Sequence, residues 1–220
     1  MKEIVRRRTL ELVGGNPVEF KRYSSDRQQV NPSKRMISID TLLSRLEIPP
    51  DGTVLDIGTG YGYGAILLAD RGNRVIALER NKEKILEGVD YWRKLGYDCD
   101  FQTSLDGALD NSSQIVFIHG DSSSLNGVPG GMVDGAFSFY ISGYMLIDKG
   151  TFNDISRVLK PESRFILSTE GPTKLPYFLR RTAVKVLANL CVPKGLHYDR
   201  TISLNEKKVY DRHVVILTKK

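Results

Sequence analysis

The chain has 220 residues, 40% of them hydrophobic, which is enough for one well-buried domain with modest additions. Its longest uncharged stretch, residues 135–147, is too short and polar to cross a bilayer, and no basic-then-apolar signal segment opens the chain. We therefore expect a soluble, cytoplasmic protein that does not contact membranes. Cys99 and Cys191 lack histidine neighbours at ligand spacing, which argues against a disulfide framework and a metal site.

The net charge of +6 is distributed unevenly along the chain. Residues 1–50 hold 10 basic and 6 acidic side chains, residues 51–170 hold 11 and 17, and residues 171–220 hold 11 and 3. An acidic centre suits a cationic ligand, and basic flanks suit an anionic substrate or RNA. The alternative is that the basic side chains only solvate exposed faces.

The first part of the chain predicts two short helices and a loop. Residues 1–13 have a helical pattern, residues 23–32 are polar, and residues 33–46 repeat apolar side chains at helical spacing. We expect residues 1–32 to form an N-terminal helix and a lid segment, and residues 33–220 to form the main domain.

Four glycines at alternate positions, Gly58 to Gly64, follow a short apolar strand, Val54–Ile57, and precede an apolar helix, Ala65–Ala69. Glycine is needed where a backbone takes a positive φ or lets a ligand touch the main chain. The unpaired N–H groups of the following helix point to the same place. This stretch therefore predicts a ligand-binding turn.

A second buried strand, Arg74–Leu78, ends on Glu79, about 20 residues past the glycines, where a carboxylate suits a ribose diol. The spacing Gly60-x-Gly62-x-x-Ala65 also satisfies the dinucleotide fingerprint, so the glycines alone leave NAD and a dehydrogenase open. Asp56 argues against NAD, because a carboxylate there would repel a pyrophosphate and attract an ammonium or sulfonium group.

The later elements alternate helix and strand. They are a helix at Asn81–Leu95, an insertion of moderate to low order at Tyr97–Ser113, strand three at Gln114–His119, strand four at Val133–Phe139, a helix at Asp148–Leu159, strand five to Ser168, an amphipathic helix at Leu175–Cys191, and a terminal hairpin of Tyr198–Leu204 and Lys208–Thr218.

Residues 55–62 match the first motif of the class I S-adenosylmethionine-dependent methyltransferases, apolar-apolar-Asp-x-Gly-x-Gly-x-Gly, and the chain resembles that family from about residue 33 onward. Residues 158–163 are similar to its Val-Leu-Lys-Pro-Gly-Gly turn, with Glu162 and Ser163 in place of the glycines. The resemblance implies a Rossmann-like, doubly wound α/β fold. Its seven-stranded sheet would be mostly parallel, with an antiparallel C-terminal hairpin strand and helices on both faces.

The resemblance also implies S-adenosylmethionine as cofactor and assigns residues to it. The expected cofactor-binding residues are Asp56, Gly58, Thr59, Gly60, Gly62, Glu79, Arg80, Asp121, Ser122 and Ser138. Asp121 follows strand three and matches the acid that binds the adenine amino group, although Asp121 and Ser122 also fit a turn cap. Tyr140, His119 and Tyr144 are candidates for a catalytic base, and each also has a plainer role in packing or capping.

Several acceptors remain open at this stage. Residues 139–142, Phe-Tyr-Ile-Ser, lack the Asn/Asp-Pro-Pro-Tyr/Phe motif of amino-methylating nucleic-acid enzymes and the Pro-Cys pair of cytosine C5 enzymes. We therefore expect methyl transfer to a small molecule by in-line displacement. The alternatives are an RNA acceptor bound by the basic flanks and a non-catalytic binding subunit. The protein is expected to be a monomer or homodimer.

Overall fold

The structure is a computed structural model that describes residues 39–105, 107–120, 125, 128–141, 149–170, 195–206 and 210–220. Its contacts divide the chain into two units, residues 1–45 and residues 46–220, and the fold below is that of the second unit. In the first unit, residues 39–43 are helical. The predicted helices at residues 1–13 and 175–191, and the predicted lid segment, lie outside the described residues.

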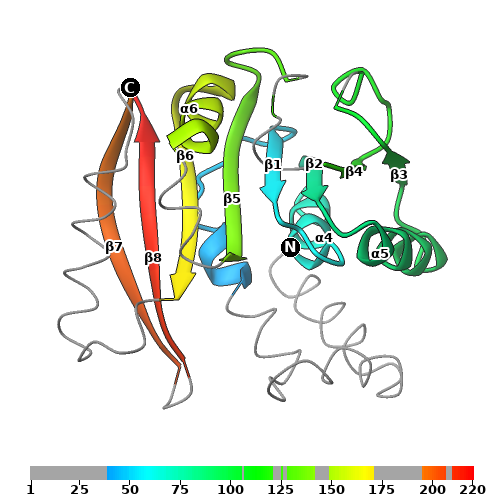
Figure 1. The fold of residues 1–220 in the computed structure, drawn as a ribbon, viewed down its shortest axis with the longest axis horizontal. Helices are drawn as coiled ribbons and strands as arrows, with labels where there is room; N and C mark the ends of the chain where they lie inside the picture. Colours follow the sequence, from blue (N-terminus) through cyan, green and yellow to red (C-terminus); the bar gives the residue numbers. More distant parts are fainter. Residues whose placement is uncertain are drawn as a thin grey trace. The chain divides into compact units, whose positions relative to one another are not determined.

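One sheet with connecting helices forms the second unit (Figure 1). Its strands are β1 (Thr53–Ile57), β2 (Arg74–Glu79), β3 (Cys99–Gln102), β4 (Ile115–His119), β5 (Val133–Ile141), β6 (Leu159–Glu170), β7 (Leu196–Glu206) and β8 (Tyr210–Lys219). The helices labelled in this unit are α4 (Tyr63–Ala69), α5 (Lys82–Lys94) and α6 (Lys149–Val158). Within the described ranges, none of the helices has the length and apolar character needed to cross a bilayer.

The strand order is β3-β4-β2-β1-β5-β6-β8-β7. The strands from β3 to β6 in this order pair in parallel, whereas β8 pairs antiparallel with both β6 and β7. The prediction of a mostly parallel sheet with an antiparallel strand in the C-terminal hairpin is confirmed. Over the residues that the structure describes, however, the sheet has eight strands and not the predicted seven.

Helices pack on both faces of the sheet, as predicted. Leu55 and Ile57 of β1 belong to a buried cluster that includes Phe152 and Ile155 of α6. The intervening residue, Asp56, points to the opposite face, where its carboxylate lies next to Gly64 of α4. Because side chains alternate along a strand, α4 and α6 cover opposite faces.

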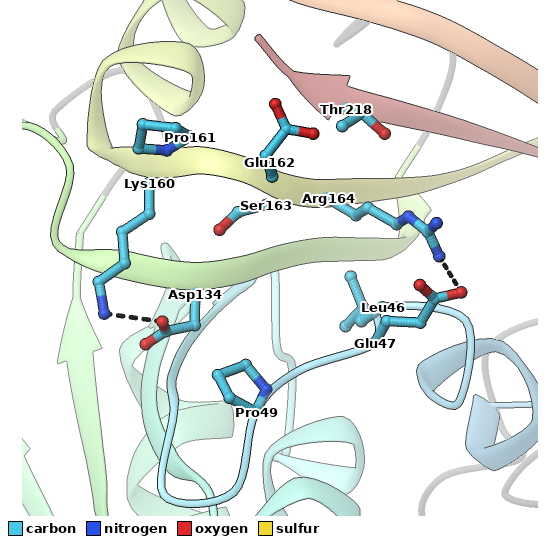
Figure 2. Close-up of a pocket in the computed structure, with 10 residues that line it drawn as sticks. All are labelled: Leu46, Glu47, Pro49, Asp134, Lys160, Pro161, Glu162, Ser163, Arg164 and Thr218. Carbon is cyan, nitrogen blue, oxygen red and sulfur yellow. Dashed lines mark hydrogen bonds and ion pairs between the residues drawn. The ribbon is translucent and has the colours of Figure 1, made fainter.

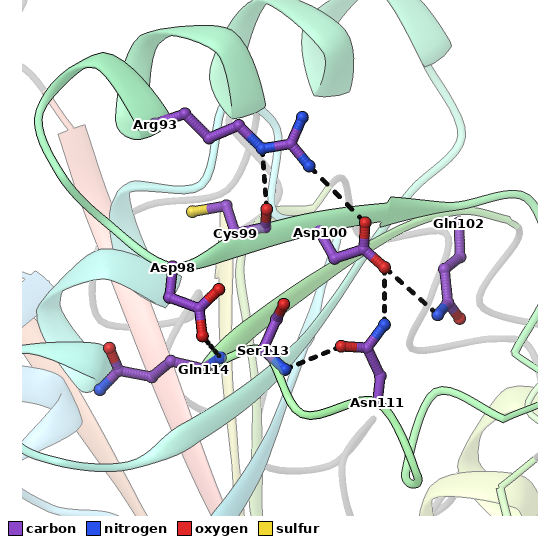
Figure 3. A network of polar contacts seen from close by, with 8 residues as sticks. All are labelled: Arg93, Asp98, Cys99, Asp100, Gln102, Asn111, Ser113 and Gln114. Carbon is purple, nitrogen blue, oxygen red and sulfur yellow. Dashed lines mark hydrogen bonds and ion pairs between the residues drawn. The ribbon is translucent and has the colours of Figure 1, made fainter.

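The additional strand, β3, lies inside the segment that was predicted to be an insertion of moderate to low order, and that prediction is wrong for residues 99–102, which form a strand of the sheet. Polar contacts hold β3 in place at the edge of the sheet (Figure 3). Arg93 of α5 donates from Nε to Cys99 O (2.8 Å), and Asn111 donates from Nδ2 to Asp100 Oδ2 (2.6 Å). Side chains that bind backbone groups leave no apolar period in the sequence, so pattern analysis missed this strand.

Arg74, the first residue of β2, also orders this segment. Its guanidinium donates to the carbonyl oxygens of Ala108, Leu109 and Asn111, which lie in the turns between β3 and β4. Burial lowers the pKa of Arg74 from its ordinary value, while Asp110 opposes that shift.

Glu162 has a φ of 65°, in the left-handed region that glycine adopts at little cost. It is one of the two residues that replace the glycine pair of the resembling motif. It lies in β6, where the pairing with β5 shifts register between Val133 and Gly135. The side chain at this position therefore strains the backbone.

We predict that Glu162→Gly raises the free energy of unfolding by up to about 1 kcal/mol, because it removes the left-handed strain at the expense of some chain entropy. Urea unfolding followed by circular dichroism measures the change. Ser163→Gly is the matched control and should give no gain, since φ at Ser163 is not positive. Equal effects at the two positions would contradict the assignment of strain to Glu162.

Candidate functional site

Residues 58–62, here called the glycine loop, connect β1 to α4 at the carboxyl end of β1. Gly58, Gly60 and Gly62 have φ values of 74°, 62° and 90°, which side chains rarely adopt. The N–H groups of Gly58 and Thr59 both donate to Leu78 O, at 2.8 and 2.9 Å. The glycine loop therefore folds over the carboxyl end of the neighbouring strand, β2.

Glu79, the last residue of β2, is bound at both carboxylate oxygens by backbone donors. Gly60 N–H donates to Oε2 at 3.0 Å, and Asn81 N–H donates to Oε1 at 2.9 Å. The side chain is half-buried. These two bonds hold Glu79 in one orientation. Since a carboxylate oxygen can accept more than one hydrogen bond, Glu79 keeps the capacity to accept from a ligand.

Asp56 lies under the glycine loop, with only 2% of its surface exposed. Its Oδ2 accepts a hydrogen bond from Thr59 Oγ1 at 2.6 Å. Burial raises the pKa of Asp56 from 3.8 to about 7, and the charge of Glu79 adds to the rise, while bonds from Thr59 and the Ala65 backbone oppose it. The carboxylate thus contacts the loop itself, and Asp56 and Glu79 are close enough for their charges to interact.

The glycines of this stretch fall into two groups. A Cβ added at Gly60 would meet no heavy atom of the described residues within 4 Å. A Cβ at Gly62 would lie 2.6 Å from the Phe117 ring, and one at Gly64 would lie 2.7 Å from the Phe137 ring. Gly62 and Gly64 are therefore required by packing, whereas none of the described residues fills the space beside Gly60.

Arg80 and His119 lie beside Glu79. His119 is the residue of β4 that pairs in register with Glu79, and its Nε2 is 3.1 Å from Arg80 O. Arg80 is exposed. The structure therefore brings these predicted residues together with Glu79 at adjacent strand ends.

Ser138 of β5 is fully buried and donates from Oγ to Ile57 O at 2.8 Å. This bond joins β5 to the end of β1 just before the glycine loop. It gives Ser138 a structural role, and contact with a cofactor stays a prediction.

The structure does not describe the side chains of four predicted site residues. Asp121, Ser122 and Tyr144 lie outside the described residues, and Tyr140 lies in β5 with only its backbone described. Their roles stay predictions.

Sequence reasoning missed two residues that hold the glycine loop. Trp92 of α5 donates from Nε1 to Tyr61 O at 2.6 Å, and Gly88 leaves room for that carbonyl. The sequence had predicted only a helix over Asn81–Leu95 at this position. The available signal was the spacing of Gly88 and Trp92, four residues apart on one face.

A separate pocket of about 450 Å³ lies at the other end of the strands, near the amino ends of β5 and β6 (Figure 2). Four of its charged side chains form two pairs: Lys160 donates to Asp134 at 2.7 Å, and Arg164 pairs with Glu47. The glycine loop follows the carboxyl end of β1, so this pocket is not part of the same site.

A family model described as a methyltransferase domain matches residues 55–167, about half of the chain, and the chain belongs to this family of S-adenosylmethionine-dependent methyltransferases. The matched residues span β1 to β6 and include the glycine loop and Glu79.

Individual relatives agree with this assignment. Protein-L-isoaspartate O-methyltransferase 1 of Syntrophobacter fumaroxidans is 38% identical over 64 residues, which cover 29% of this chain and 30% of that protein. Two solved structures share the fold. A SAM-dependent methyltransferase from Aquifex aeolicus has a TM-score of 0.61 at 16% identity, over 93% of this chain and 99% of that one. Geranyl diphosphate C-methyltransferase from Streptomyces coelicolor A3(2), in complex with S-adenosyl-L-homocysteine, has a TM-score of 0.65 at 13% identity, over 98% and 92%.

The cofactor of this family is S-adenosylmethionine, and the residues of the glycine loop fit it. In the described part of the chain no atom fills the space that a side chain at Gly60 would take, and the oriented carboxylate of Glu79 is bound to the Gly60 N–H. A ribose diol needs such an acceptor at the end of the second strand.

We predict that Gly62→Ala lowers the free energy of unfolding by about 1–3 kcal/mol more than Gly60→Ala does. Both variants force alanine into a positive φ, but only the alanine at position 62 overlaps Phe117. Urea unfolding of the two variants provides the comparison. Equal losses would show that packing does not distinguish these glycines.

The raised pKa of Asp56 should make the free energy of unfolding depend on pH. The folded chain keeps the proton of Asp56 up to about pH 7, whereas the unfolded chain releases it near pH 3.8. Because the folded state binds more protons between these values, Asp56 lowers the free energy of unfolding as the pH rises from about 4 to 7.

Asp56→Asn removes this titration. As the pH rises from 5 to 7, the free energy of unfolding of the variant should therefore increase by on the order of 1–3 kcal/mol relative to that of the wild type. Chemical unfolding at several pH values measures the difference. Asp90→Asn, on the exposed surface of α5, is the control and should give parallel curves. A constant difference between Asp56→Asn and the wild type would contradict the raised pKa.

Proposed function

We propose that the chain is an S-adenosylmethionine-dependent methyltransferase that transfers a methyl group to a small-molecule acceptor. The main support for the proposal is the hydrogen bond from Gly60 N–H to Glu79 Oε2 (3.0 Å). This bond holds the Glu79 carboxylate in a fixed orientation next to Gly60. Glu79 would accept hydrogen bonds from the ribose hydroxyls, and Gly60 would let the ligand lie against the backbone.

The electrostatics of the site support a cationic ligand. Glu79 and Asp56 place two acids around the glycine loop, and residues 51–170 as a whole carry more acidic than basic side chains. A positive charge nearby would favour the ionised form of Asp56, whose pKa burial raises to about 7. Asp56 would act on such a ligand through its field, since its carboxylate is bonded to Thr59.

The bound cofactor supplies an electrophilic methyl group on a sulfonium. The chain contributes mainly by holding the ligand and the acceptor in line, and alignment of this kind is worth about 7–11 kcal/mol of the barrier. Where the acceptor must lose a proton, His119 is the described candidate base, at the end of β4 beside Glu79. Tyr140 and Tyr144 remain proposed alternatives.

Two observations support a small-molecule acceptor. Residues 139–142, at and beyond the end of β5, lack the signatures of nucleic-acid methyltransferases. In addition, a structure similar over 98% of this chain is a geranyl diphosphate C-methyltransferase, which by its name acts on a small molecule.

An RNA acceptor is the second candidate, favoured by the basic flanks of the sequence. Contacts to phosphates would make RNA affinity fall steeply with salt concentration. Filter binding of RNA at low and moderate salt tests this alternative. Affinity that does not change with salt would eliminate it.

Isothermal titration with S-adenosyl-L-homocysteine or S-adenosylmethionine tests the cofactor assignment. We predict binding by the wild type and at least a tenfold rise in Kd for Glu79→Gln, since the amide lacks the charge and one of the two acceptors. Glu83→Gln is the matched control, because Glu83 is exposed in the first turn of α5, and it should leave Kd unchanged. Absence of binding by a folded wild type would refute the proposed function.

A further inference from the structure

The glycine loop is held from two sides. Its first half is bound to β2, through Gly58 and Thr59 to Leu78 O and through Gly60 to Glu79. Its second half is bound to α5, where Tyr61 O accepts a hydrogen bond of 2.6 Å from Trp92 Nε1.

Little spare room exists around the Tyr61 carbonyl. Gly88 lies one helical turn before Trp92, and a Cβ added to it would lie 2.7 Å from Tyr61 O and 3.1 Å from Tyr61 C. A Cβ at Gly62 would lie 3.2 Å from Trp92 Nε1. The absence of side chains at these two glycines therefore lets the indole and the loop backbone meet.

Trp92 is itself fixed in place. Only 2% of its surface is exposed, and its ring makes edge-on contacts with Tyr63, Tyr91 and Tyr97 at centroid distances of 5.4, 4.9 and 5.8 Å. A donor with so little freedom defines where the carbonyl that it binds can lie.

The same helix also contacts the Tyr61 side chain. Lys84 Nζ lies 5.9 Å from the centroid of the Tyr61 ring, within reach of a cation–π interaction. Both the backbone and the ring of Tyr61 are thus bound by α5.

We propose that Trp92 is a positioning residue for cofactor binding: its indole N–H holds Tyr61 O and so sets the path of the glycine loop next to Glu79. This inference rests on the proposed function, because it concerns the affinity of the same site. Trp92 acts through Tyr61 and makes no contact with the ligand in this account.

The first test is Trp92→Phe, which keeps an aromatic ring in the cluster and removes the N–H donor. Calorimetric titration with S-adenosyl-L-homocysteine should show Kd rising about tenfold, since the Tyr61 carbonyl loses its donor and the loop its anchor. Tyr97→Phe is the matched control. It removes a hydrogen bond from Tyr97 Oη to Asp70 Oδ1 (3.0 Å) in the same cluster and should change Kd less than twofold.

The second test is Gly88→Ala, which keeps Trp92 and adds a methyl group that would overlap the Tyr61 carbonyl. Alanine favours the helix itself, so weaker cofactor binding by this variant could not be ascribed to loss of α5. Trp92 is the only tryptophan in the chain, so its fluorescence reports this contact without interference. We expect a shifted emission maximum in the free protein together with a raised Kd.

Thermal unfolding of all the variants separates affinity from stability. A raised Kd for Trp92→Phe and Gly88→Ala with a normal Kd for Tyr97→Phe would support the positioning role. Values within twofold of the wild type for Trp92→Phe and Gly88→Ala, or an equal rise for Tyr97→Phe, would overturn it and leave Trp92 as a packing residue. Failure of the wild type itself to bind would overturn the proposed function instead.

Discussion

The site depends on the contact between the glycine loop and the end of β2. Leu78 O accepts two backbone hydrogen bonds from the loop, and Glu79 accepts a third from Gly60. Parallel pairing brings the carboxyl ends of β1 and β2 together, so these bonds form at the edge of the sheet where open α/β folds generally bind ligands. The acid is thereby oriented before any ligand arrives, and preorganisation of this kind favours binding.

Two features of the site act on Asp56 in opposite directions, its burial and its hydrogen bond to the glycine loop. Its burial raises its pKa to about 7, which disfavours the charge that would attract a cation, yet its bond to Thr59 stabilises the glycine loop. Since a bound cation would lower the pKa of Asp56 again, ligand binding and release of a proton should be coupled.

Sequence patterns predicted the central parallel strands well, because buried strands such as β1 and β2 are continuous apolar runs bounded by glycines or charged residues. They failed at β3, where the strand is stabilised by Asp100, Asn111 and Arg93 through specific bonds that follow no period. Alternating glycines predicted the loop but could not reveal that Gly62 is required by packing and Gly60 is not, since that difference depends on Phe117 in a distant strand. Trp92 was missed for the same reason, because its partner is a backbone carbonyl 31 residues away.

We propose that the glycine loop and Glu79 together hold an adenosyl cofactor, and a crystal structure of the protein with S-adenosyl-L-homocysteine would show whether they do. We expect both ribose hydroxyls within hydrogen-bonding distance of the Glu79 carboxylate and the ligand in van der Waals contact with Gly60. A ligand bound elsewhere, or bound without contact to Glu79, would refute this role of the loop and of Glu79.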